Sequence, residues 1–363
     1  MKLDDPRLMA VKAMCLANAL ATNTQKAYGY RFAHFVGFCE RAEVSSWLSG
    51  DGPVADEDAL VGFCLYEFEV QGNKFSTIRA KLSAIRWHTM ERGYPNPLEG
   101  KHVLRRLLAG MRRLRGRVEP KEPLPMEVIL RLFHLVMKRG RLHLKATVLA
   151  IVVAFFFLLR VSEFAAQDSH HMEKFILLRS CVTFRKDGRV CEWYEKPDEV
   201  ELYIRGSKTD QEMQGCVRSH FRSGSDLCPV EALVTWFKLT EGCKVPASAP
   251  LFSVPDGKSD AWTVITRNDV SELIKRAAVD CGVPKALIGT HSIRISGATH
   301  LLLCGCHPSV VQIIGRWKGN CFLRYQRYQS ELMHGVSAHM AGSKFNMRLR
   351  QELKLQNCGL DQD

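Results

Sequence analysis

Side chains that bind anions gather between residues 289 and 328. His291 and Arg294 stand three residues apart, so on a helix both side chains project from one face. Thr290 is placed to cap that helix, whose N-terminal end attracts negative charge. A histidine and an arginine at a helix N-terminus make an anion clamp, although in isolation this spacing is more typical of a surface ion pair.

Two more cations, far apart in the sequence, can serve the same anion. Arg160 ends a strongly apolar run. Because burying an unpaired arginine is costly, Arg160 must meet an anion, either Glu163 or a ligand phosphate. Lys208 follows a predicted strand in a polar turn, from which its flexible ammonium group can reach into a cleft. Each of these residues also has a structural explanation, as a paired or a solvated charge.

Five short segments follow one another in a recognisable order, namely LLRVSE, SKTD, HSIR, GRW and FLRY. In them Trp317 follows Arg294 by 23 residues, and Tyr325 follows Trp317 by eight. This order of Arg, Lys, H-x-x-R, His or Trp and Tyr resembles the tyrosine recombinases, the phage-integrase family of site-specific DNA recombinases. HSIRISGAT, SKTDQ and GRWKG are most similar to recombinases of eukaryotic mobile elements of the Crypton and DIRS kind. TNTQKAYGYRFAHFVGFC and STIRAKLSAIRWH are similar to the family's helical core-binding domain, so the resemblance covers nearly the whole chain.

The resemblance implies a reaction for four of these residues. Tyr325 attacks the scissile phosphate and forms a 3′-phosphotyrosyl link. Arg160 and Arg294 clamp the non-bridging oxygens with their planar donors. Lys208 acts as the general acid for the 5′-hydroxyl leaving group.

The remaining site residues have supporting roles by the same resemblance. His291 assists proton transfer or donates to the phosphate, Trp317 donates through its indole N–H, and Glu163 orients these groups as an accessory residue. A packing role in the core is the alternative for Trp317. We expect no metal and no cofactor, and religation without ATP, because the tyrosyl link stores the phosphodiester energy.

A second tyrosine competes for the role of nucleophile. Tyr328 lies three residues after Tyr325 and roughly on the same helical face. Many family members place the nucleophile nine residues after the His or Trp, and Gln326 occupies that position here. The mobile-element recombinases that FLRY resembles have the shorter spacing, which favours Tyr325.

A zinc site is a further possibility near the same segments. His300, Cys304, Cys306 and His307 supply four possible ligands within eight residues. Their spacing matches no common zinc pattern. We therefore expect free thiols here and no metal site.

Composition limits the class of partner. The 363 residues include 51 Lys and Arg against 38 Asp and Glu, a formal net charge of +13, which indicates a polyanion partner. By composition alone, that partner is nucleic acid or an acidic membrane surface. The longest apolar run, residues 146–159, is too short to span a bilayer, so we expect no transmembrane protein. The resemblance to tyrosine recombinases implies double-stranded DNA as the partner, and no membrane. Thirteen cysteines without a secretory signal favour reduced thiols. We expect a nuclear protein in a eukaryote or a cytoplasmic, nucleoid protein in a bacterium, and not a secreted one.

More than half of the excess charge lies in one short stretch. Residues 101–121 hold eight basic side chains and one acidic, a net charge of +7. Pro120, Pro123 and Pro125 favour an extended linker, and the cations are expected to follow the DNA backbone without reading bases. Solvated surface is the alternative explanation for such a charge run. The candidate phosphate contacts are Arg79 and Arg86 in the helical domain, and Arg105, Arg106, Arg112, Arg113, Arg115 and Arg117 in the linker.

These patterns predict a mainly α fold with a helical SAM-like N-terminal domain and an α+β catalytic domain that contains a small antiparallel sheet. Helical periodicity covers residues 8–48 and 76–91, and Asp187-Gly188 is typical of a hairpin turn. The predicted parts are residues 1–100 as the DNA-binding core-binding domain, 101–125 as the basic linker, 126–341 as the catalytic domain and 342–363 as the tail.

The predicted function is that of a site-specific DNA recombinase or integrase. By resemblance it acts as a homotetramer on DNA, with a monomer possible in isolation, and the segment after Tyr325 docks onto a neighbouring subunit. Two alternatives stay open, a host-adopted DNA-binding protein that no longer cuts and a type IB topoisomerase. The integrase-like N-terminal segment argues against the topoisomerase.

Overall fold

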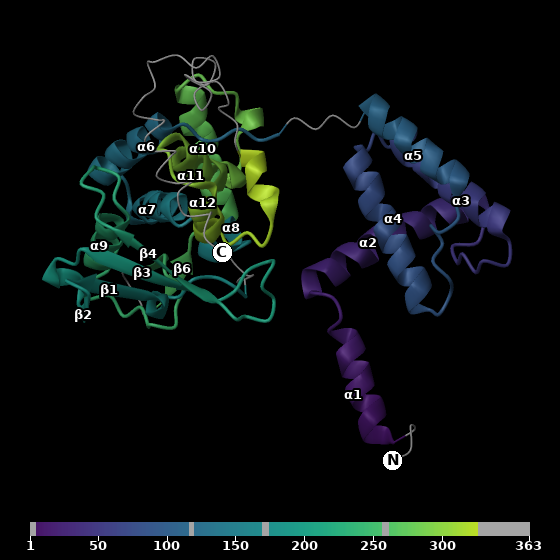
Figure 1. The fold of residues 1–363 in the computed structure, drawn as a ribbon, viewed down its shortest axis with the longest axis horizontal. Helices are drawn as coiled ribbons and strands as arrows, with labels where there is room; N and C mark the ends of the chain where they lie inside the picture. The colour runs from purple at the N-terminus through teal and green to yellow at the C-terminus, as the bar shows by residue number, and fades with distance from the viewer. Residues whose placement is uncertain (1–4, 116–119, 169–173, 256–260, 326–363) are drawn as a thin grey trace, which may run out of the picture. The chain divides into compact units, whose positions relative to one another are not determined.

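The computed structural model describes residues 5–115, 120–168, 174–255 and 261–325, without the side chains of residues 324 and 325. The chain divides into two compact units, Met1–Glu119 and Pro120–Asp363. Figure 1 shows both units coloured along the chain.

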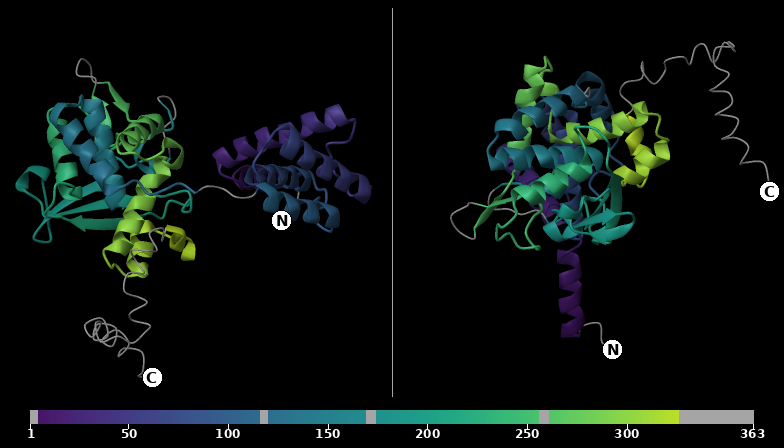
Figure 2. Two further views of the ribbon diagram at one scale, coloured as in Figure 1. Left: turned by 90° about the horizontal axis from the view of Figure 1, so that it is seen from above. Right: turned by 90° about the vertical axis from the view of Figure 1, so that its left-hand side faces the viewer.

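The first unit is helical. Its elements are α1 (Pro6–Ala17), α2 (Thr22–Ala42), α3 (Pro53–Leu65), the π-helical turn η1 (Tyr66–Val70), α4 (Phe75–Glu91) and α5 (His102–Arg115). Phe35, Phe63 and Ile85 lie in the core that α2 to α5 share. α1 buries no residue and projects away from the other helices (Figures 1 and 2). The helical segment expected over residues 8–48 is thus two helices, separated near Asn18–Ala21.

The expected linker over residues 101–125 is ordered at both ends. Its first part is α5, which packs on α3 and α4 and buries Leu104 and Met111 in the core of the first unit. Its last part binds the second unit, because Glu122 N–H donates to Leu287 O at 2.9 Å and Leu124 N–H donates to the Ser296 hydroxyl at 2.6 Å. The prolines favour an extended chain at the end of this segment. The part upstream of them is helical, because the apolar positions of α5 pack in the core of the first unit.

The second unit combines helices with a small sheet. Its helices and helical turns are α6 (Met126–Arg139), α7 (Leu142–Phe156), α8 (Val161–Phe164), η2 (Arg179–Cys181), η3 (Trp193–Glu195), α9 (Pro229–Leu239), α10 (Arg267–Asp280), η4 (Lys285–Leu287), α11 (Thr290–Leu303), α12 (Pro308–Gly315) and η5 (Asn320–Tyr325). Its strands are β1 (Val182–Lys186), β2 (Arg189–Cys191), β3 (Glu199–Ile204), β4 (Cys216–Phe221), β5 (Ser253–Pro255) and β6 (Trp262–Val264).

The main sheet is antiparallel with strand order β2-β1-β3-β4. Phe184 pairs with Cys191 on β2 and with Val200 on β3, which fixes the register. Asp187 and Gly188 connect β1 to β2 with φ values of 52° and 75°, the left-handed pair that a tight hairpin turn requires. The predicted hairpin and small antiparallel sheet are therefore confirmed. α9 packs on β3 and β4 and against α7, so the sheet covers one side of the helical body (Figure 1).

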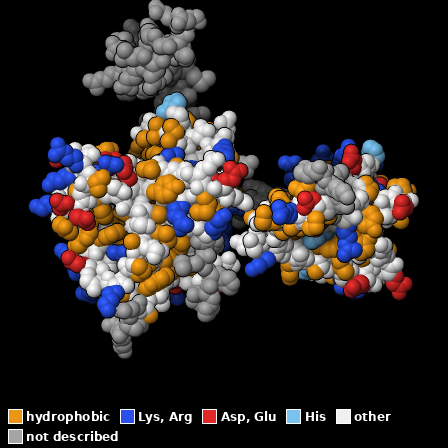
Figure 3. Space-filling model, turned by 90° about the horizontal axis from the view of Figure 1, so that it is seen from below, with side chains coloured by type: hydrophobic (Ala, Val, Ile, Leu, Met, Phe, Trp, Pro, Cys, Tyr) orange, Lys and Arg blue, Asp and Glu red, His pale blue; other side chains and the backbone are white. Residues whose placement is uncertain are grey.

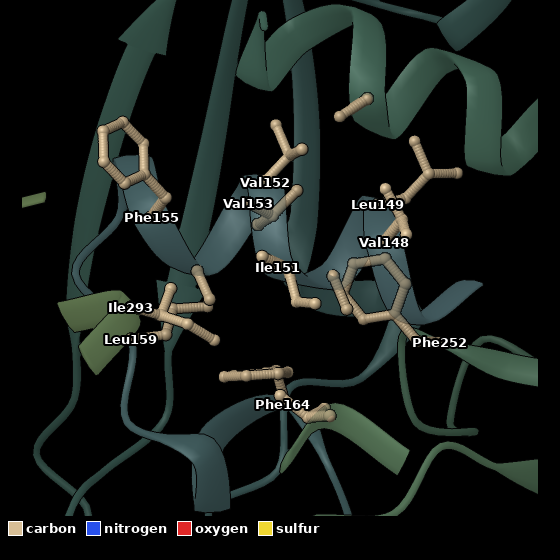
Figure 4. Close-up of a cluster of buried hydrophobic side chains, with 14 of the residues drawn as sticks. Val148, Leu149, Ile151, Val152, Val153, Phe155, Leu159, Phe164, Phe252 and Ile293 are labelled. Carbon is tan, nitrogen blue, oxygen red and sulfur yellow. The ribbon is translucent and has the colours of Figure 1, made fainter. Parts of the chain in front are cut away.

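α7 is the centre of the second core. Its residues from Ala146 to Phe155 are all buried, because α6, α9, α10 and α11 surround it. Figure 4 shows Phe164, Phe252 and Ile293, from three distant segments, around the side chains of α7. This apolar run is a core helix, and in the described ranges no helix is both long and apolar enough to cross a membrane.

Candidate active site

The chain turns sharply where α7 ends. Leu158 is fully buried and adopts a left-handed backbone with φ of 48°, which a non-glycine residue rarely does. Two residues later Arg160 becomes the N-cap of the short helix α8. The turn therefore places a charged side chain directly after α7, a helix whose residues from Ala146 to Phe155 are all buried.

Glu163 is the anion that Arg160 meets. The Arg160 backbone N–H donates to Glu163 Oε2 at 2.9 Å, and its Nη1 donates to Oε1 at 3.1 Å. The Glu163 side chain is 0% exposed and that of Arg160 is 19% exposed. Arg160 is thus held by a buried carboxylate while part of its guanidinium group faces solvent.

The turn that carries Lys208 lies beside Arg160. Arg160 Nη2 lies 3.4 Å from the Thr209 hydroxyl, and Lys208 itself is exposed in the connection between β3 and β4. Ser207 and Asp210 close this turn through two backbone hydrogen bonds of 3.0 and 3.1 Å. The turn is therefore a defined structure that places the lysine one residue from an arginine contact.

α11 brings a second arginine to the end of α7. Arg294 is 1% exposed and donates through Nη1 to Leu158 O and through Nη2 to Gly315 O. The backbone N–H of Gly289, the N-cap, donates to the Ser292 hydroxyl at 3.1 Å, so Thr290 is the first residue of the helix and does not cap it. His291, in the first turn of α11, is exposed. Of the H-x-x-R pair, Arg294 is therefore buried and His291 is exposed.

Trp317 stacks on Arg294. The Arg294 guanidinium carbon lies 4.4 Å from the centroid of the Trp317 ring, within the range of a cation–π contact. The ring also packs in a small apolar cluster with Phe322, at 6.1 Å between ring centroids. A Cβ atom at Gly315 would collide with the Trp317 ring, so only glycine fits there.

Arg316 is a functional candidate that sequence reasoning missed. It lies between Gly315 and Trp317 as the left-handed C-cap of α12, with φ of 59°. Its Nη2 donates to Glu163 Oε2 at 2.7 Å and to Leu158 O at 3.2 Å. A third arginine thus joins the group, which we call the arginine cluster and define as Arg160, Glu163, Arg294 and Arg316.

The structure describes the approach to Tyr325 but not its side chain. Tyr325 is the last residue of η5, which packs against α11 and α12. Phe322 is buried in the same turn and fixes η5 beside Trp317. The rival nucleophile Tyr328 lies outside the described residues.

The predicted DNA-contacting arginines of the first unit separate into two groups. Leu104 and Met111 mark the core face of α5, and Arg115 lies close to that face on the helical wheel. Arg115 donates to Phe68 O at 2.8 Å and to Glu69 at 3.1 Å. Arg117 lies outside the described residues. Arg115 is itself exposed, although Phe68 O and Glu69 hold its guanidinium group. The other exposed arginines of the predicted set, on the outer surfaces of α4 and α5, are Arg79, Arg86, Arg105, Arg106, Arg112 and Arg113.

Basic side chains also occur on the face of the molecule in Figure 3, on both units.

Among the four residues with zinc-type side chains, the two histidines have other contacts. His307 caps α12, with its Nδ1 2.7 Å from the Ser309 hydroxyl, and the His300 ring lies 5.9 Å from that of Phe155. Cys304 is exposed and Cys306 is partly exposed.

Comparisons with known proteins identify the fold. No protein-family model and no curated protein sequence matches the chain. Among solved structures, XerH site-specific recombinase bound to a palindromic difH substrate in a post-cleavage complex is 14% identical, covering 80% of this chain and 72% of its own, with a TM-score of 0.51. A lambda integrase dimer bound to a COC′ core site is 12% identical, covering 88% of this chain and 76% of its own, with a TM-score of 0.51.

A third structure is the Tn1549 transposon integrase in complex with transposon right end DNA, 16% identical over 75% of this chain and 81% of its own, with a TM-score of 0.49. The similarity to the XerH and lambda integrase structures shows that the chain has the fold of the tyrosine recombinases. This fold is mostly helical with a small antiparallel sheet, as expected. Within that fold, α7, α8, α11 and α12 together build the arginine cluster.

Proposed function

We propose that this chain is a site-specific DNA recombinase or integrase that cuts and rejoins duplex DNA through a 3′-phosphotyrosyl intermediate. One observation carries the proposal. Arg160 and Arg294, which are far apart in sequence, are both anchored at the end of α7, where a cluster of three guanidinium groups contains one carboxylate. Guanidinium donors that are held in place stabilise the negative charge of phosphate oxygens, and a DNA phosphate is an anion of this kind.

Each residue has a part in the transfer. Arg160 and Arg294 stabilise the charge that develops on the non-bridging oxygens of the scissile phosphate. Tyr325 attacks the phosphorus and displaces the 5′-oxygen, to which Lys208 gives a proton. The exposure of Lys208 and its place beside the Arg160 contact support this role.

Three further residues support the phosphate site. His291, exposed in the first turn of α11, donates to the phosphate or moves a proton. Trp317 donates through its indole N–H and supports Arg294 with its ring. Glu163 orients Arg160 without reacting.

A covalent trapping assay tests the nucleophile. Incubation with a nicked suicide substrate, on which religation is blocked, yields a protein–DNA adduct that migrates as one band on a denaturing gel. Tyr325→Phe abolishes the adduct, and Tyr328→Phe retains it. The reverse pattern assigns the nucleophile to Tyr328. Adduct formation continues in excess chelator and without ATP, because the phosphodiester energy stays in the tyrosyl link.

The same assay separates the competing functions. Adduct formation followed by strand exchange between two duplexes supports a recombinase. DNA binding without an adduct indicates a host-adopted DNA-binding protein. Relaxation of supercoiled DNA without exchange indicates a type IB topoisomerase.

We further propose that the active form is a homotetramer on DNA. In the second unit, a mostly apolar cavity of about 460 Å³ is lined by residues of α6, α7 and α11, among them Leu130, Phe155 and Leu301. A cavity of this kind can receive the segment after Tyr325 from a neighbouring subunit. The similarity of HSIRISGAT to Crypton and DIRS recombinases suggests a mobile-element origin and, in a eukaryotic host, a nuclear location.

A further inference from the structure

The burial of the Arg316 side chain is not explained by its place at the end of α12. Its side chain is only 9% exposed, although it follows the last residue of α12. Its Nε and Nη1 atoms are buried and have no hydrogen-bond partner among the residues that the structure describes. Because unpaired buried donors cost free energy, the burial of Arg316 does not serve stability alone.

The contact that Arg316 does make controls Glu163. Glu163 Oε2 accepts from Arg316 Nη2 at 2.7 Å and from the Arg160 backbone at 2.9 Å, while Oε1 accepts from Arg160 Nη1 at 3.1 Å. The carboxylate is thus fixed from two sides. Without Arg316, Glu163 would face Arg160 alone, and its charge would neutralise the guanidinium group that binds the phosphate.

Arg316 also connects the two phosphate-binding arginines. Leu158 O accepts from Arg316 at 3.2 Å and from Arg294, whose other amino group binds Gly315 O, the carbonyl directly before Arg316. The Arg316 side chain therefore contacts α8 through Glu163 and the end of α7 through Leu158 O, and Arg316 directly precedes Trp317. A displacement of Arg316 would therefore disturb the positions of both Arg160 and Arg294.

We infer that Arg316 is a positioning residue of this site, which holds Glu163 and thereby keeps Arg160 oriented and positively charged toward the phosphate. The inference rests on the proposed function. Because a positioning residue of this kind acts through Glu163, its loss slows the chemical step more than it weakens DNA binding.

The test compares Arg316→Met, Arg316→Lys and Arg218→Ala. Methionine keeps much of the buried volume without charge. Arg218 is a matched control, because its Nε donates to Ile313 O at 2.9 Å and so supports the same end of α12 outside the arginine cluster. Single-turnover cleavage of the suicide substrate at saturating DNA gives the rate constant, and a titration gives the Kd.

We expect Arg316→Met to lower the cleavage rate constant about 10- to 100-fold while Kd changes less than about threefold. Arg316→Lys recovers part of the rate because it restores the charge beside Glu163. Arg218→Ala stays within about twofold of the wild type, as expected for an arginine that lies outside the cluster. Equal rates for the wild type and Arg316→Met would overturn the inference.

A second readout is independent of cleavage. The Arg160 amide donates to Glu163, so its hydrogen exchange reports how firmly the carboxylate is held. We expect at least about tenfold faster exchange in Arg316→Met and no change in Arg218→Ala. Unchanged exchange at Arg160 in Arg316→Met also overturns the inference. A wild-type protein that forms no adduct refutes the proposed function, and the exchange measurement then still decides whether Arg316 holds Glu163.

Discussion

Glu163 binds Arg160 through both of its carboxylate oxygens, Oε2 at the backbone N–H and Oε1 at the guanidinium group. Through the same Oε2 it also binds the side chain of Arg316. A single fully buried carboxylate thus fixes the position and the direction of an arginine at the end of the core helix.

Glu163→Gln is expected to destabilise the protein by about 3 kcal/mol, because it removes the buried negative charge with which both Arg160 and Arg316 pair. Denaturant unfolding measures the loss. Glu201→Gln is the control, since Glu201 pairs with Arg185 at 3.0 Å in a partly exposed site, where the cost stays below about 1 kcal/mol. Equal costs for the two variants would contradict the buried network.

Gly315→Ala is expected to displace the Trp317 ring and to destabilise the protein by about 1–3 kcal/mol. The added Cβ would overlap the ring, and the ring supports Arg294. Tryptophan fluorescence measures the displacement, and a Trp317→Phe background removes the signal. Gly319→Ala, where a Cβ meets nothing within 4 Å, should leave both stability and fluorescence unchanged.

His220 should make the second unit sensitive to acid. Burial lowers the pKa of this histidine, which a backbone hydrogen bond at Phe156 offsets in part. As the pH falls below about 6.5, the unfolded chain binds a proton that the folded protein resists, so the free energy of unfolding drops by up to about 1.4 kcal/mol per pH unit.

Urea denaturation at pH 8 and pH 5.5 measures this loss. His220→Phe, whose ring suits the contacts with Phe156 and Phe157, reduces the difference between the two pH values. An equal pH dependence in His220→Phe and the wild type would refute the assignment.

The outer face of α5 is expected to bind DNA phosphates. The double variant Arg106→Ala/Arg113→Ala should reduce the slope of log K against log salt by about 0.9 for each phosphate that the protein no longer neutralises. Arg115→Ala should leave the slope unchanged, because Glu69 and Phe68 O hold that side chain within the first unit. Binding isotherms at several salt concentrations provide the measurement. A reduced slope in Arg115→Ala alone would reverse the assignment.

Local signals in the sequence predicted several elements well. A two-residue hairpin turn at Asp187-Gly188 requires a left-handed backbone at both residues, and both have positive φ values in the structure. The apolar run before Arg160 is long enough for a buried helix, and α7 is that helix. The need of Arg160 for an anion predicted either Glu163 or a ligand phosphate as its partner, and in the structure Arg160 pairs with Glu163, three residues further along the chain.

Features that depend on distant contacts could not be predicted in this way. Arg316 lies inside the GRW segment, but its partner Glu163 is 153 residues away, so the local pattern did not reveal the contact between them. From the sequence alone, α5 is interpreted as a linker because arginines dominate the segment. Leu104 and Met111 nevertheless have the spacing of residues on the buried face of a helix. Charge alone does not distinguish a linker from the solvent face of a helix.

The carbonyl group of Leu158 anchors both Arg294 and Arg316. A main-chain oxygen is present whatever the side chain at that position, provided that the backbone keeps its left-handed turn. This part of the site is therefore specified by chain conformation and not by amino-acid identity. A substitution at position 158 that keeps the turn and the buried packing also keeps the anchor, so a comparison of residue types alone would overlook it.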